Sequence, residues 1–126
     1  MSARHGAQLL AGARAALGAV VLVAPEAVLS RWLGAQNARR GAVKALGRGL
    51  AARDIGLALA SLQTLDDPVI GPRVLAACAL ADAVDALAAL LERESLPALG
   101  AAATVAVAGG AAAAGLVFAR RIADGD

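Results

Sequence analysis

The sequence predicts an all-α integral membrane protein, a four-helix bundle with short connections, and two observations carry that prediction. Of its 126 residues, 60% are hydrophobic and only 17% are charged, whereas soluble domains average roughly 45–50% apolar and about 25% charged residues. The apolar residues also fall into four stretches, each near the ~20 residues that a helix needs to cross a bilayer. Polar positions do not alternate along these stretches and alanine dominates them, so strands are not expected.

One domain is expected over residues 1–126, because the chain is too short for two ordinary domains. An alanine-rich soluble bundle is the alternative, but the mean hydropathy of +0.69 favours lipid as the solvent. The amino terminus carries Arg4, His5 and Arg14 before the apolar run "AALGAVVLVA", a pattern also found in signal peptides. We interpret it as a retained first helix.

The first predicted span covers about residues 7–24 and is closed by Pro25. The link that follows, about 25–42, contains "PEAVLSRWLG", which places Val28, Leu29, Trp32 and Leu33 on one helical face. This pattern predicts a short helix in the membrane interface, with Trp32 as an anchor at headgroup depth. An ordinary surface loop is the alternative.

Three more spans are predicted, at about 43–63, 70–91 and 98–119. The segment "QTLDDP" separates the second from the third, and "ERESLP" separates the third from the fourth. Both segments are rich in residues that break helices, and Pro97 suits a first helical turn. The fourth span has no charged residue, so we expect it to face lipid or a second subunit.

The charged residues inside the spans predict a buried network. Each would cost roughly 2.5–3.5 kcal/mol at a helix centre if it stood alone, so we expect them to face the bundle interior and to pair. Because the second and third spans form a hairpin, Arg48 should match Asp85 in depth and Arg53 should match Asp82. A midplane cluster is expected, with Arg48 and Asp85 nearer one surface. The predicted network consists of Arg14, Arg48, Arg53, Asp54, Asp82 and Asp85.

Three roles fit such a network. Paired charges can fix helix register in lipid, where apolar packing specifies little, and this structural role is favoured. One of the aspartates can instead take up and release a proton or an ion during transport. In the third role the arginines hold an anion, a lipid headgroup or a cofactor.

The sequence predicts no enzyme, no metal site and no cofactor. His5 lies at the amino end, and the four serines have no Gly-x-Ser-x-Gly context. Asp82 and Asp85 are too few to make a metal site by themselves. The single cysteine, Cys78, cannot form an internal disulfide and is expected to pack as a small hydrophobic residue. A clustered basic face with aromatic residues is absent, which argues against nucleic acid as a partner.

The segments "GRGLAARDIGLALA" and "ADAVDALAALL" resemble a family of small four-helix bacterial integral membrane proteins of unknown function. The matching positions are Arg48, Arg53, Asp54 and Asp82. The resemblance implies the same fold and adds no activity.

We therefore expect a multi-pass protein of the bacterial inner membrane that acts as a structural or accessory component. Its expected partners are the lipid bilayer and either further copies of the chain or a larger membrane complex. The alternative is a small proton- or ion-coupled transporter that uses Asp54, Asp82 or both. The compact basic cluster of the first link favours the cytoplasmic side for that link.

Overall fold

The computed structural model describes all residues from 1 to 126 and is entirely helical, without strands. Four long helices fall on the four predicted apolar segments, and α5 has the predicted bounds. A short helix follows Pro25, where the sequence predicted one. The helices are α1 (Ala3–Val23), α2 (Pro25–Leu33), α3 (Ala35–Ala38), α4 (Gly41–Thr64), α5 (Ile70–Leu91) and α6 (Ala98–Ala123).

Three of the long helices, α1, α5 and α6, are long and apolar enough to cross a membrane. Their most apolar windows have mean hydropathies of 1.6, 2.1 and 1.9, and these helices indicate a membrane protein. Helix α4, with 24 residues, is also long enough to span. It falls outside this group because it carries Lys44, Arg48, Arg53 and Asp54. Of the four predicted spans, the structure supports three.

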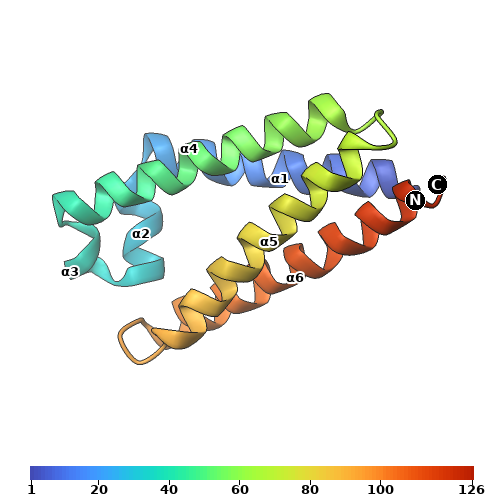
Figure 1. The fold of residues 1–126 in the computed structure, drawn as a ribbon. Coiled ribbons are helices and arrows are strands. Elements are labelled where there is room, and N and C mark those ends of the chain that lie inside the picture. The colour runs from blue at the N-terminus through green and yellow to red at the C-terminus, as the bar shows by residue number, and fades with distance from the viewer.

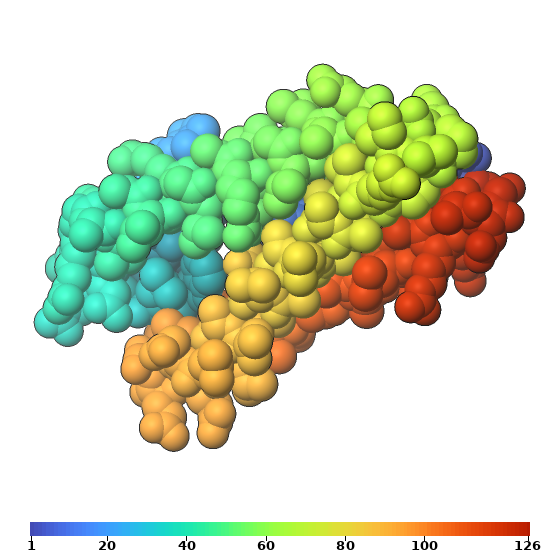
Figure 2. Space-filling view, in the orientation of Figure 1, coloured from blue at the N-terminus to red at the C-terminus, as the bar shows by residue number.

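The long helices form two antiparallel hairpins, α1 with α4 and α5 with α6 (Figure 1). The hairpins meet at the end where both chain termini lie, and they separate toward α2, α3 and the α5–α6 turn (Figure 1). In the space-filling view, the α5–α6 turn stands apart from α3 and the start of α4 (Figure 2). We call the two regions the closed end and the open end of the molecule.

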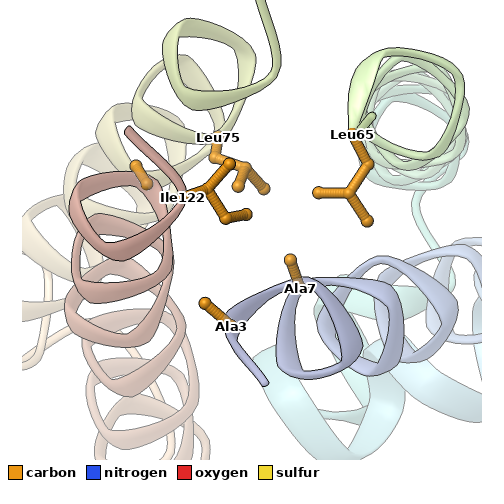
Figure 3. Packing of buried hydrophobic residues seen from close by; sticks show 6 residues of the cluster. Ala3, Ala7, Leu65, Leu75 and Ile122 are labelled. Atoms are coloured by element: carbon orange, nitrogen blue, oxygen red, sulfur yellow. The ribbon is translucent and has the colours of Figure 1, made fainter. Parts of the chain in front are cut away.

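Small residues surround a few larger ones at the closed end. Leu65, Leu75 and Ile122 are each at most 3% exposed and converge with the alanines of α1 (Figure 3). Phe118 packs against this cluster, and a Cβ added to Gly6 would lie 2.5 Å from its ring. The closed end is therefore closely packed around Gly6, which is the ordinary condition of a protein core.

At the open end, α2 is inserted between α4 and α6. Leu29 is fully buried, and a Cβ added to Gly47 of α4 would lie 2.8 Å from one of its methyl groups. A Cβ on Gly100 of α6 would collide with the backbone carbonyl group of Trp32. The apolar face predicted for α2 thus packs against two long helices, and glycines make room for it.

The turn between α4 and α5 is fixed by Asp67. Its Oδ1 accepts hydrogen bonds of 2.8 Å from the backbone N–H groups of Val69 and Ile70. The bond from Ile70, and to a smaller extent the bond from Val69, lowers the pKa of Asp67. Both do so because they favour the ionised carboxylate. Asp67 thereby satisfies backbone donors at the start of α5, in the "QTLDDP" segment where a helix break was expected.

Candidate functional site

A chain of ion pairs crosses the molecule between the closed and open ends. Arg53 of α4 stands at one side, with its Nη2 2.5 Å from Asp85 Oδ2 and 3.0 Å from Asp54 Oδ1. The same Asp54 oxygen lies 3.2 Å from Arg14 Nη1 of α1. Arg14 Nη2 then donates to Asp82 Oδ2 of α5. The order of the network is therefore Asp85, Arg53, Asp54, Arg14, Asp82, and it joins three helices.

Burial increases along this chain. The side chains of Arg53 and Asp85 are 33% and 31% exposed, and that of Asp54 is 23% exposed. Arg14 and Asp82 are each only 9% exposed at the other end. Because ion pairs gain strength as water is excluded, the Arg14–Asp82 pair is the strongest candidate for a structural contact in the network.

Helical geometry explains how three helices supply these groups. Asp82 and Asp85 are three positions apart, so both lie on one face of α5. Arg53 and Asp54 are neighbours and diverge by about 100° around the helix axis. Asp54 therefore reaches Arg14 on α1, while Arg53 reaches Asp85 on α5. Helix α4 connects the two hairpins through this adjacent pair.

The pairing differs from the one expected from the hairpin rule. Asp82 pairs with Arg14 in place of Arg53, and Asp85 pairs with Arg53 in place of Arg48. Arg48 is exposed and lies outside the network; its Nε donates to the carbonyl oxygen of Leu22 at 3.4 Å. The reason is helical phase, since five positions turn Arg48 about 140° away from Arg53. The prediction that Arg48 belongs to the buried network is therefore wrong.

Removing Arg48 from the network changes its charge. The expected set of three arginines and three aspartates was neutral. The observed network has two guanidinium groups and three carboxylates, so it formally carries one unbalanced negative charge. No group of three or more His, Cys, Asp and Glu side chains is placed to hold a metal ion.

A cavity of about 570 Å³ extends from the network to α2 at the open end. Its walls are mainly apolar and come from α1, α2, α4 and α6, while α5 contributes only Asp82 and Asp85. Leu17, Leu50 and Val107 are among the wall residues. All five network residues also line the cavity, so the charges are reachable from this space.

On the other side of the network lies a much smaller void of about 10 Å³, lined in part by Arg14, Ser61, Cys78 and Asp82. That volume is near the minimum that holds one water molecule. Cys78 is buried and its Sγ lies 3.3 Å from Ser61 Oγ. The thiol packs among helices, as expected. Ser61 was missed by the sequence analysis, although a serine inside an apolar span was the available signal.

Trp32 is one of the residues that line the large cavity. Its Nε1 is buried and has no hydrogen-bond partner, a feature found at no other buried side-chain nitrogen or oxygen. Its position at headgroup depth stays a prediction. His5 is exposed at the amino end, where its backbone N–H donates to Ser2 Oγ.

No family model, curated protein or solved structure matches this chain. The resemblance to small bacterial membrane proteins therefore rests on the two sequence segments alone, and the site must be interpreted from its own geometry.

Proposed function

We propose that this chain is a structural or accessory protein of the bacterial inner membrane, with α4 as a fourth span beside α1, α5 and α6. The observation that carries the proposal is the ion-pair chain that joins α1, α4 and α5. It gives each ionised side chain near the middle of α4 a partner on another helix. The charges that weaken α4 as a single span are the ones that attach it to its neighbours.

The remaining charges of α4 fit the same arrangement. Lys44 and Arg48 lie among the first eight residues of α4, near the open end. Lys44 Nζ lies 3.9 Å from Glu26 of α2, and Arg39 pairs with the same carboxylate at 3.7 Å. Long basic side chains near a span's end can extend to the headgroups. Only Arg53 and Asp54 then need compensation inside the bilayer.

The outer surface supports a bilayer as the main partner. Leucines and valines of the long helices that do not line the cavity are exposed, for example Leu80 and Leu87 of α5 at 66% and 54%. Such a surface suits lipid chains. It also suits a second copy of the chain or a larger membrane complex, and we propose an assembly of one of these kinds.

Membrane fractionation tests the first part of this proposal. The intact chain should remain with the membrane pellet after washing at high pH and should require detergent for release. A single cysteine at position 36, in a Cys78→Ala background, should label from the cytoplasmic side. Recovery of a folded monomer in the soluble fraction would contradict the proposal.

A second function, proton- or ion-coupled transport, is favoured by one observation. The cavity ends on carboxylates that outnumber their arginine partners. Purified protein in liposomes with an enclosed pH dye distinguishes the two functions. The structural role predicts no proton flux above that of empty liposomes. Flux in the wild type that disappears in an Asp82→Asn variant shown to be folded would establish transport and overturn the accessory role.

A further inference from the structure

The cavity at the open end has the size and composition of a small-molecule site. Its volume of about 570 Å³ falls within the roughly 300–1,000 Å³ typical of such sites. Apolar side chains of α1, α4 and α6 form the walls, and the charged network forms the inner end. Sites of this kind bind molecules with an apolar body and one polar group.

The inner end has free hydrogen-bond acceptors. Asp54 accepts every hydrogen bond through Oδ1, and Asp82 accepts through Oδ2. Asp54 Oδ2 and Asp82 Oδ1 accept none. Since Trp32 Nε1 is the only buried side-chain polar atom without a partner, these two oxygens retain accessible surface. All three nitrogens of Arg53 and both terminal nitrogens of Arg14 already donate to carboxylates.

The remaining charged lining residue does not cancel this excess at the inner end. Arg31 belongs to α2, at the opposite end of the cavity, and is exposed. Its Nη1 donates to the carbonyl oxygen of Ala27 in its own helix at 3.2 Å. The inner end thus keeps one unbalanced carboxylate charge with two accessible oxygens, whose complement is a single positive charge.

We propose that this cavity binds a hydrophobic organic monocation. The cationic group lies at the unpaired oxygens of Asp54 and Asp82, and the apolar body lies against α1, α4 and α6 toward α2. An organic cation fits better than a metal ion, because no three metal-binding side chains converge and most of the lining is apolar. The proposal goes beyond the accessory role and does not depend on it.

Two probe ions of equal shape and opposite charge test the inference. The wild-type protein in nanodiscs of zwitterionic lipid is dialysed against tetraphenylphosphonium or tetraphenylborate, with empty nanodiscs subtracted. We expect saturable binding of one cation per chain, at least tenfold tighter than any saturable binding of the anion. Equal binding of both ions would mean an apolar cavity without charge selection, such as one filled by a lipid chain, and would overturn the proposal. Absence of saturable cation binding would do so as well.

Two variants locate the site. Asp54→Asn removes the unbalanced charge and should weaken cation binding by about tenfold or more, equivalent to about 1.4 kcal/mol. Ala108→Trp fills the cavity from α6 without altering a charge and should abolish binding. Asp66→Asn, at the exposed α4–α5 turn, is the matched control and should bind as the wild type does. If Asp54→Asn does not fold, Ala108→Trp decides; cation binding unchanged in every folded cavity variant would refute this location.

Discussion

The closed and open ends of this molecule are built from the same alanine-rich helices, yet they are stabilised differently. At the closed end, Leu75 and Ile122 pack between the hairpins and are almost fully buried. At the open end the hairpins separate, α2 enters between them, and a cavity remains. The ion pairs lie at the boundary between the two regions. Alanine side chains bring two helices together well but cannot fill a gap, so polar contacts hold the hairpins where apolar packing ends.

The largest expected effect comes from breaking that boundary at its most buried pair. Asp82→Ala leaves Arg14 buried without its main partner and should cost about 3–5 kcal/mol of unfolding free energy. The double variant Arg14→Ala with Asp82→Ala should recover much of this loss, because neither charge then remains unpaired. Reversible unfolding in mixed micelles measures all three variants.

The more exposed pair at the other side of the network provides the control for this cycle. Arg53→Ala with Asp85→Ala should show a smaller coupling energy than the Arg14 and Asp82 cycle, because both side chains are about one third exposed and solvent screens them. Equal coupling energies for the two cycles would contradict the idea that burial sets the strength of each pair.

An intermediate effect is expected where α2 packs against α6. Gly100→Ala places a Cβ against the backbone of Trp32, and overpacking of this kind typically costs about 1–3 kcal/mol. Helix α2 should shift away from α6 and widen the cavity. A cysteine introduced at position 103, which lines the cavity, should then react faster with a thiol-reactive probe. Gly109→Ala, in the same helix with open space at its Cβ, is the control and should be neutral or slightly stabilising. Similar destabilisation by both changes would show that α2 is not docked as described.

The smallest expected effect concerns the α4–α5 turn. The pKa of Asp67 is lowered in the folded protein, so its contribution to stability is present above the unfolded-state pKa of about 3.9. That contribution is lost as pH falls through the lower folded-state value. Thermal unfolding between pH 7 and pH 3 should therefore show a slightly smaller loss of stability in Asp67→Asn than in the wild type. Asp66 accepts neither of these backbone hydrogen bonds, so Asp66→Asn is the control and should behave as the wild type does.

The helices were predictable because their signals are local. Apolar length placed the four long segments, and Pro25 with the face of Leu29 and Trp32 placed α2. What the sequence could not provide was the angle between the hairpins. With alanine on nearly every face, no side chain of distinctive size marks which surfaces meet, so splayed and parallel arrangements have the same pattern.

The network shows the same limit at the level of single residues. Matching depth brought Asp85 toward a charge of α4, but it gave Asp82 the wrong partner, because depth is only one coordinate. The direction of each side chain around its helix decided the partners, so Arg14 took Asp82, and Arg53 took Asp85. Arg48 lies five residues nearer the open end than Arg53 and bonds the carbonyl oxygen of Leu22 in place of a carboxylate. The cavity was not predictable because it depends on the hairpin angle.

The dependence of α4 on its neighbours has a consequence for how the chain is made. Arg53 and Asp54 would each cost roughly 2.5–3.5 kcal/mol at the centre of an isolated span, yet their partners lie on α1, synthesised earlier, and α5, synthesised later. When α4 leaves the ribosome, only Arg14 is available, and it engages Asp54 alone. Arg53 then has only its neighbour Asp54, and it gains its partner on another helix when Asp85 emerges. If α4 crosses the bilayer, its stable insertion follows the emergence of α5. A nascent chain arrested before Asp85 has left the ribosome should therefore hold α4 at the translocon or at the membrane surface.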